Sequence, residues 1–266
     1  MQALADHMIQ STIRRNMKPP RAYENPDFLY SEHARSLRIL SEYHYPLHRF
    51  EELGVTDTVV FFGSARIPSP EKRQDAPRPA SRLNELDSFY DAAREVSREL
   101  TRWSITHAKP KGRSFLVCTG GGPGIMEASN RGAYDAGGPS IGLNIELPRE
   151  QHPNPFITDE LNFDFHYFFT RKFWFLYFAR ALIAFPGGFG TLDELFETLT
   201  LQQTMNIRNQ IPVFLYGKRF WERLIDFDFL VEYGLISPGD RKLFQIVDSV
   251  PEAMEAMIPV LESQIQ

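Results

Sequence analysis

From Thr56 onward, short apolar runs alternate with longer segments in which apolar residues recur every three or four positions. The short runs predict β-strands and the longer segments predict amphipathic helices. The expected strands are residues 58–62, 114–119, 140–145, 181–185 and 211–215. The expected helices are residues 86–106, 124–136, 170–180, 191–204, 219–231 and 251–263.

This alternation sets the expected fold class. Short apolar strands separated by helices indicate a parallel sheet that helices cover on both faces. We therefore expect an α/β fold, a Rossmann-like doubly wound parallel sheet, over residues 55–266. Residues 1–54 are more polar and carry one helical pattern, at residues 34–53, which predicts an N-terminal helical extension. Residues 68–82 hold four prolines and several charges, which predicts an exposed loop.

Glycine-rich loops follow three of the expected strands. In open parallel sheets, ligands bind outside the carboxyl ends of the strands, where these loops would lie. The candidate binding residues are Ser64 and Arg66 after the first strand, Gly121, Gly122 and Gly124 after the second, and Gly187, Gly188, Phe189, Gly190 and Thr191 after the fourth.

The third of these loops leads directly into an expected helix. Its glycines let backbone amides approach a ligand without clashes from Cβ atoms. Free amides and the helix dipole at that point favour an anion, and the hydroxyl of Thr191 adds a donor. The loop therefore predicts a site for a phosphate monoester dianion.

Composition narrows the class of ligand and partner. Lys and Arg number 29 against 34 Asp and Glu, a formal charge of −5, so no basic field favours nucleic acid. The single cysteine, Cys118, cannot form an internal disulfide. The most apolar stretch, residues 173–185, is interrupted by Arg180 and is too short to span a bilayer. We expect a soluble, cytoplasmic protein without a membrane or nucleic-acid partner.

Familiar phosphate and metal motifs do not fit. A P-loop needs a lysine before its final Ser or Thr, whereas this loop ends in Gly190 and Thr191. A dinucleotide fingerprint that starts at Gly120 would need glycine where Ile125 stands. The seven histidines show no paired ligand spacing, so we expect no metal.

At these residues the chain resembles the LOG family, cytokinin-activating phosphoribohydrolases once labelled lysine decarboxylases. The family signature PGGxGTxxE is matched throughout residues 186–194 and ends on Glu194. The family's upstream Arg-Lys pair is matched by Arg171 and Lys172, with Arg171 lying 23 positions before Glu194. The segments GSAR and GGGPGIMEA are similar to those of the longer bacterial members, and the resemblance covers residues 56–266.

The resemblance implies an activity and roles for residues. Family members hydrolyse the N-glycosidic bond of a nucleoside 5′-monophosphate, here AMP or a cytokinin riboside 5′-monophosphate, to a free base and ribose 5-phosphate. Glu194 and Arg171 would be catalytic, the glycine loops and Lys172 would bind the nucleotide, and no cofactor is expected. A homo-oligomer, dimer or larger, is also implied, and the aromatic residues at 173–178 would suit its interface.

The chemistry of the two catalytic candidates agrees with this activity. Cleavage of a ribosyl C–N bond builds positive charge on the sugar, which a nearby carboxylate stabilises. Glu194 could also bind ribose hydroxyls or orient water. A guanidinium stays charged, so Arg171 would clamp phosphate or position Glu194 rather than donate a proton.

Structural interpretations stand beside these roles. Thr191 and Glu194 also match a capping box, and Arg171 could be a surface arginine at a helix start. The glycines at 120–124 could form only a tight turn. Arg66 fits a solvated loop charge as well as a phosphate contact. Glu127 fits a dipole-favoured acid better than a catalyst.

Two other functions compete with the hydrolase. A nucleotide or cofactor carrier could use the same fold without catalysis, although it would not need the Arg171–Glu194 pair. A pyridoxal-phosphate decarboxylase needs a Schiff-base lysine. Lys172, Lys109 and Lys111 do not stand in an obvious position for one.

Overall fold

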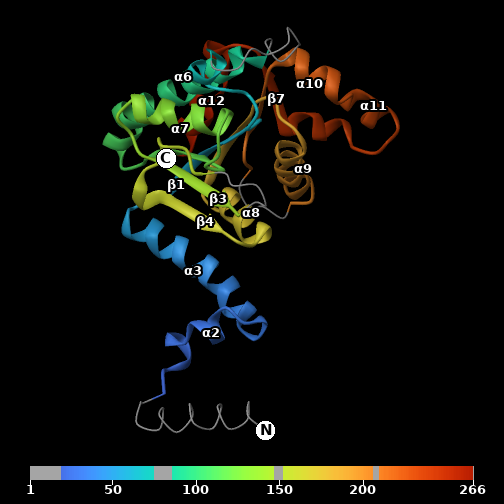
Figure 1. Ribbon diagram of the computed structural model, residues 1–266. Coiled ribbons are helices and arrows are strands. Elements are labelled where there is room, and N and C mark those ends of the chain that lie inside the picture. Colours follow the sequence, from blue (N-terminus) through green and yellow to red (C-terminus); the bar gives the residue numbers. More distant parts are fainter. Residues whose placement is uncertain (1–18, 75–85, 147–151, 206–209, 266) are drawn as a thin grey trace. The chain divides into compact units, whose positions relative to one another are not determined.

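One parallel sheet of seven strands forms the centre of the protein (Figure 1). The computed structural model describes residues 19–74, 86–146, 152–205 and 210–265. The strands are β1 (Asp57–Phe62), β2 (Phe115–Thr119), β3 (Ser140–Ile145), β4 (Asn162–Phe165), β5 (Ala179–Ala184), β6 (Val213–Tyr216) and β7 (Phe244–Val247). They pair in the order β4-β3-β2-β1-β5-β6-β7, and every pair is parallel.

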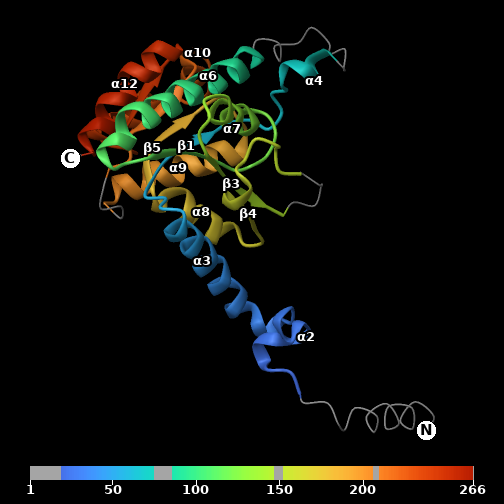
Figure 2. The same cartoon turned by 90° about the vertical axis from the view of Figure 1, so that its left-hand side faces the viewer.

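Helices cover both faces of the sheet, as the alternating pattern predicted. On one face lie α6 (Ser88–Trp103), α7 (Ile125–Asp135) and α12 (Val250–Ser263). On the other lie α8 (Phe168–Tyr177) and α9 (Phe189–Gln203) (Figure 2). The Rossmann-like doubly wound fold is therefore confirmed.

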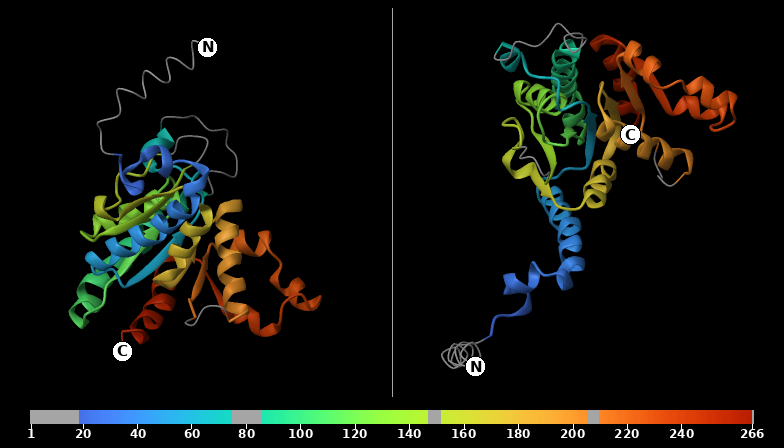
Figure 3. Two further views of the ribbon diagram at one scale, coloured as in Figure 1. Left: turned by 90° about the horizontal axis from the view of Figure 1, so that it is seen from below. Right: turned by 45° about the vertical axis from the view of Figure 1, so that its right-hand side comes forward.

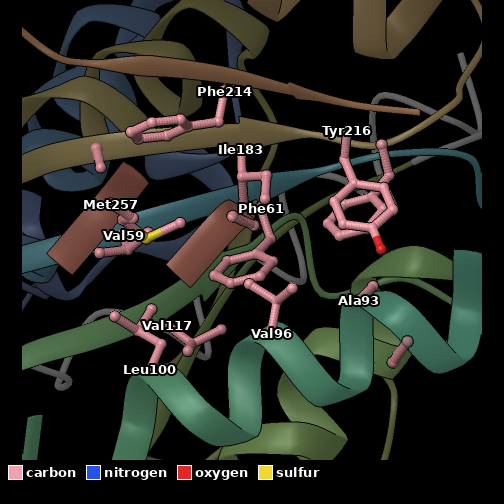
Figure 4. Close-up of a cluster of buried hydrophobic side chains, with 14 of the residues drawn as sticks. Val59, Phe61, Ala93, Val96, Leu100, Val117, Ile183, Phe214, Tyr216 and Met257 are labelled. Carbon is pink, nitrogen blue, oxygen red and sulfur yellow. The ribbon is translucent and has the colours of Figure 1, made fainter. Parts of the chain in front are cut away.

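The residues of β1 show why both faces must be covered. Val59 and Phe61 are fully buried in a cluster with Val96 and Leu100 of α6 (Figure 4). Phe62, which follows Phe61 in β1, points to the opposite face, where its ring lies 4.9 Å from that of Phe175 in α8. Because alternate residues of a strand face opposite sides, a wholly apolar strand needs a helix layer on each side.

The strand order places a topological switch point between β1 and β5. From β1 the chain proceeds outward through β2, β3 and β4, whereas from β5 it proceeds the other way through β6 and β7. The loops that leave two such strands diverge and leave a crevice at their carboxyl ends, where ligands of doubly wound folds bind. The loops after β1 and β5 are two of the three glycine-rich loops.

Both edge strands were missing from the predicted set. β4 alternates exposed and buried residues, and most of β7 is only partly covered, so neither forms a continuous apolar run. The expected helix at 219–231 is also wrong as a single element. It is divided into α10 (Lys218–Leu224) and α11 (Phe227–Glu232), because the side chain of Asp226 accepts a hydrogen bond from the Phe229 amide and starts a new helix.

The ends of other helices and strands differ from the predicted ends by a few residues. The helix expected to reach residue 180 ends at Tyr177, because Ala179 already pairs with Thr58 in the sheet. Short elements complete the described chain: α2 (Pro26–Leu29), α4 (Pro70–Gln74), a π-helical turn at Ser104–Ala108, and 3₁₀ turns at Ala22–Glu24, Glu32–Ala34, Lys109–Lys111, Asp159–Leu161 and Pro238–Leu243. α10 lies beside β6 and β7 at the edge of the sheet (Figures 1 and 3).

The contacts divide the chain into two compact units, Met1–His44 and Tyr45–Gln266. The helix expected at residues 34–53 is α3 (Arg35–Glu52), which runs from one unit into the other. Residues 1–18 of the expected extension and 75–82 of the expected proline-rich loop lie outside the described residues. The expectation of a loop is wrong for residues 70–74, which form the short helix α4. The domain boundary after residue 54 therefore stays a prediction. Within the described residues, no helix combines the length and apolarity that a bilayer crossing requires.

A buried carboxylate joins three strands at the amino-terminal edge of the sheet. Asp57, at the start of β1, is fully buried, and its Oδ1 lies 2.6 Å from Nη2 of Arg113 and 2.5 Å from Nε of Arg180. Arg113 precedes β2 and Arg180 lies in β5. The three side chains therefore tie together the central strands.

We expect Asp57→Asn to lower the free energy of unfolding by about 2–3 kcal/mol, since two guanidinium groups lose their buried counter-charge. The partial exposure of both arginines keeps the loss below that of a fully buried pair. Urea unfolding measures it, with Asp91→Asn as control. Asp91 is 57% exposed beside Arg73, so its loss should stay within about 0.5 kcal/mol. Equal effects of the two substitutions would contradict this account.

Candidate active site

The third glycine loop joins β5 to α9 at the carboxyl edge of the sheet. α9 begins at Phe189, and Gly188 is its N-cap. The N–H groups of a first helical turn have no acceptor within the helix, and the dipole there favours an anion. Gly188, Phe189 and Gly190 are exposed, and Phe189 is 92% exposed. The predicted phosphate loop is therefore an accessible helix start.

The start of α9 overturns the capping-box interpretation. Because Gly188 is the N-cap, Thr191 is the third residue of the helix and Glu194 lies a further turn along it. Thr191 is buried, and a Cβ atom on Gly187 would lie only 2.1 Å from its Oγ1. Glycine at 187 is thus required by the close approach of this side chain.

The structure brings the three loops together at the switch point. The Ser64 amide, after β1, donates to the Pro186 carbonyl at 3.0 Å. The Ile125 amide, at the start of α7, donates to the Ser64 carbonyl at 3.1 Å. A Cβ atom on Gly124 would lie 2.3 Å from that same oxygen. The loop after β1 is therefore hydrogen-bonded to both of the other glycine loops, the one after β2 and the one after β5.

Arg171 and Glu194 meet beside these loops. Nη2 of Arg171 lies 3.9 Å from Oε1 of Glu194, and the two side chains are 13% and 7% exposed. A Cβ atom on Gly120 would lie 3.9 Å from Nη1 of Arg171, so the guanidinium also reaches the second glycine loop. The interpretation of Arg171 as a surface arginine is therefore wrong.

Aromatic rings surround the guanidinium of Arg171. Its central carbon lies 5.2 Å from the ring centroid of Phe168 and 5.5 Å from that of Phe175. The Nε atom is buried and has no hydrogen-bond partner within the described residues. Buried donors are usually paired, but the Nε atoms of Arg98 and Arg113 likewise lack a hydrogen-bond partner there, so this atom alone does not indicate a ligand.

Burial governs the protonation of Glu194. It raises the pKa of this carboxyl to about 7, against the attraction of Lys172 and Arg171, which favour the ionised form. A carboxyl with this pKa exchanges its proton near neutral pH. Such groups concentrate at catalytic sites, because general acids and bases need pKa values near the working pH.

The side chain of Lys172, which follows Arg171 in α8, also faces α9. Its Nζ is 2.8 Å from Oδ2 of Asp193 and 3.0 Å from Oε2 of Glu197. Burial opposes its charge, but these two carboxylates outweigh burial and raise the pKa of Lys172. A lysine held charged is a poor Schiff-base nucleophile, which weakens the pyridoxal-phosphate alternative. Its contact with a nucleotide stays a prediction.

The remaining candidates divide between buried and exposed positions. Gly121, Gly122 and Gly124 are buried, whereas Arg66 is exposed. Glu127 is buried, accepts a hydrogen bond from the Tyr90 hydroxyl at 2.9 Å and pairs with Lys72 at 3.2 Å. Those partners agree with the interpretation of Glu127 as a structural acid and not a catalyst.

Three buried asparagines lie beneath the second glycine loop, and the sequence did not point to them. They are Asn130, Asn144 and Asn154. The sequence contains one clue to Asn144, because this polar residue interrupts an otherwise apolar strand. It contains no such clue to Asn154, which lies in an irregular connection. No cluster of three or more His, Cys, Asp or Glu side chains suited to a metal occurs within the described ranges.

Comparison with known proteins identifies the family. The family model described as "possible lysine decarboxylase" matches residues 126–257. The cytokinin riboside 5′-monophosphate phosphoribohydrolase LOG of Oryza sativa subsp. japonica is 32% identical over 178 residues, which cover 66% of this chain and 67% of that protein. LOG1 of Arabidopsis thaliana, which carries the same enzyme name, is 32% identical over 181 residues, covering 67% of this chain and 77% of that protein. The chain belongs to the LOG family.

Solved structures show a weaker likeness. The molybdenum cofactor binding protein of Rippkaea orientalis aligns with a TM-score of 0.47 at 18% identity, over 77% of this chain and 98% of that one. The Moco carrier protein of Chlamydomonas reinhardtii aligns with a TM-score of 0.45 at 17% identity, over 78% of this chain and 99% of that one. Likeness at this level carries no functional inference.

The LOG-family motif residues meet in this structure. The Arg-Lys pair at 171 and 172 lies at the start of α8, and both side chains reach acidic residues of α9. The aromatic residues of α8 divide into two groups. Trp174 and Phe175 are buried, whereas Phe168, Phe169, Phe173 and Tyr177 are between 41% and 53% exposed. Assembly into a homo-oligomer through this face stays a prediction.

Two neighbouring glycines test the packing of the phosphate loop. We expect Gly187→Ala to lower the free energy of unfolding by about 1–3 kcal/mol, because its methyl group overlaps the Thr191 side chain. Gly188→Ala should cost less than about 0.5 kcal/mol, since no atom lies within 4 Å of its Cβ position and its φ of −95° suits alanine. Urea unfolding of both variants makes the comparison, and similar losses would show that the loop is not packed as described.

Proposed function

We propose that this LOG-family protein hydrolyses the N-glycosidic bond of a nucleoside 5′-monophosphate, either AMP or a cytokinin riboside 5′-monophosphate. Water adds across the C–N bond, so the products are the free base and ribose 5-phosphate. The observation that carries the proposal is the buried Arg171–Glu194 pair beside an accessible helix start. Family membership supports it, since the LOG relatives carry the names of phosphoribohydrolases.

The phosphate would bind at the start of α9. The amides of Phe189, Gly190 and Thr191 belong to the first turn and need an acceptor from outside the helix. A phosphate dianion supplies several acceptor oxygens and the charge that the dipole favours. Because the chain's net charge is −5, this local geometry has to provide the attraction.

A nucleotide held there would present its ribose to Glu194. The side chain lies about one helical turn beyond the phosphate loop, and a 5′-phosphate is joined to the ribose ring through only its ester oxygen and C5′. As the C–N bond breaks, positive charge builds on the ribose, and the ionised carboxylate stabilises it from inside a buried site. The same carboxylate would orient the attacking water.

Arg171 has a supporting role in this scheme. A buried guanidinium keeps its charge and favours the ionised form of Glu194, because it lowers the pKa that burial has raised. Its position near Gly120 leaves the terminal nitrogens of the guanidinium as donors for the phosphate or the base. Arg171 would thus hold both the ligand and the carboxylate, and no cofactor is required.

The decisive experiment incubates the protein with a panel of nucleoside 5′-monophosphates, including AMP and a cytokinin riboside 5′-monophosphate. We expect free base and ribose 5-phosphate in equal amounts by chromatography. Adenosine should be cleaved at least about 100-fold more slowly, because it lacks the remote phosphate that supplies binding energy for positioning. Tight nucleotide binding without product would instead favour a carrier.

The variant Glu194→Gln tests the carboxylate. It should bind the nucleotide but lose at least about 100-fold in kcat, because a neutral amide cannot stabilise the developing charge. The matched control is Glu222→Gln on α10, which is 54% exposed and should keep full turnover.

The pH profile tests the same group in the unmodified protein. The ionised form of Glu194 acts, and its pKa lies at about 7, so kcat/KM should rise with pH through about 7. Full activity of Glu194→Gln, or a profile that is flat between pH 6 and 8, would remove Glu194 from the mechanism.

A further inference from the structure

Asn154 is buried against the carbonyl groups of the second glycine loop. It lies in the connection between β3 and β4, and its Nδ2 donates to the carbonyl oxygens of Gly121 and Gly122 at 3.0 and 3.1 Å. Its backbone amide donates to the Gly121 carbonyl as well, at 2.8 Å. One residue from a distant loop therefore holds two consecutive peptide groups.

A closed hydrogen-bond network fixes the orientation of the Asn154 amide. Its Nδ2 also donates to Oδ1 of Asn130 at 2.9 Å, and that oxygen accepts a second bond from the Thr119 hydroxyl at 2.7 Å. Asn130 in turn donates to the Ser140 hydroxyl at 2.9 Å. The two N–H groups of Nδ2 are shared among these three acceptors, so the NH2 side of the Asn154 amide fits there and its oxygen does not.

This network determines where the loop amides point. No cis peptide bond occurs in the described chain, and in a trans peptide the C=O and the following N–H point in opposite directions. Because the Gly121 carbonyl points at Asn154, the Gly122 N–H points away from it. The Gly121 N–H is already used by the Thr119 hydroxyl, at 3.0 Å, and Pro123 has none.

The loop leaves no room for a side chain at residue 121. Gly121 has a φ of +73°, and a Cβ atom there would lie 2.1 Å from Oδ1 of Asn144. The preceding residue, Gly120, borders the guanidinium of Arg171. The loop is thus packed against asparagines and reaches the candidate active site through Gly120.

We propose that Asn154 is a positioning residue for nucleotide binding, which aims the Gly122 amide at the bound nucleotide by anchoring the carbonyls behind it. The inference rests on the proposed function, because it assigns the second glycine loop to the same nucleotide site. Asn154 acts through the loop and does not touch the ligand.

Asn154→Asp and Asn154→Ala test the anchor. The aspartate is isosteric but sets a carboxylate oxygen against three acceptors, whereas the alanine removes the bonds without repulsion and keeps the backbone amide of residue 154. We expect the Kd for AMP to rise about 10-fold or more in both variants. It is measured by titration calorimetry in protein that also carries Glu194→Gln, so that AMP is not hydrolysed during the titration. In the single variants KM should rise with it, while kcat changes less, because Glu194 and Arg171 stay in place.

Ser104→Ala is the matched control. The Ser104 hydroxyl is buried and accepts a hydrogen bond from the Phe115 amide at 2.9 Å, at the opposite end of the strand that leads to the glycine loop. Its loss should lower Tm, as the Asn154 variants do, but leave the Kd for AMP unchanged. A merely structural asparagine would behave in the same way as this serine.

The outcomes separate the inference from the hydrolase proposal. Kd values for both Asn154 variants within about two-fold of that of Glu194→Gln alone would overturn the inference, whatever happens to Tm. If the wild type binds AMP but does not cleave it, hydrolysis fails, and Asn154 is still judged on Kd alone. If the wild type binds neither AMP nor a cytokinin riboside 5′-monophosphate, both proposals are overturned.

Discussion

A buried carboxylate kept close to a buried guanidinium is the interaction on which the candidate site depends. Neither Glu194 nor Arg171 is well solvated, and each comes from a different helix on the same face of the sheet. Burial alone would leave Glu194 largely protonated at neutral pH, and the neighbouring cations restore part of its charge. The result is a group that can hold or release a proton where the central strands diverge.

Close packing in the loops around this pair explains why glycine occupies several positions there better than a need for flexible loops does. Gly121, Gly124 and Gly187 each face an atom within 2.3 Å of where a Cβ would stand. These positions are therefore defined by close contact, and the loops behave as packed walls of the site. By contrast, Gly188 and Gly190 face open space. Within one motif, then, some glycines serve packing and others leave access to the helix start.

The sequence predicted the central part of the fold because those strands are buried on both faces. A continuous apolar run such as 58–62 identifies such a strand, whereas β4, with Asn162 and Asp164 facing outward, does not. The motif also drew attention to Arg171 and Glu194, which meet in the structure, although their roles stay a prediction. The competing interpretation of Thr191 as a helix cap is wrong, because the helix begins earlier, at Phe189. Asn154 was invisible, because its role comes from a contact between segments some thirty residues apart. Contacts between distant segments have no periodic signature.

The position of Asp57 separates two demands on the same sheet. Its ion pairs with Arg113 and Arg180 join the central strands where they begin, whereas the glycine loops and the Arg171–Glu194 pair lie at the carboxyl ends of the strands. The stabilising ion pairs therefore lie at one edge of the sheet and the candidate site lies at the other, with the length of the strands between them. Substitutions at the amino-terminal edge of the sheet can therefore change its stability, and substitutions at the carboxyl edge can change the candidate site, with little effect of one on the other.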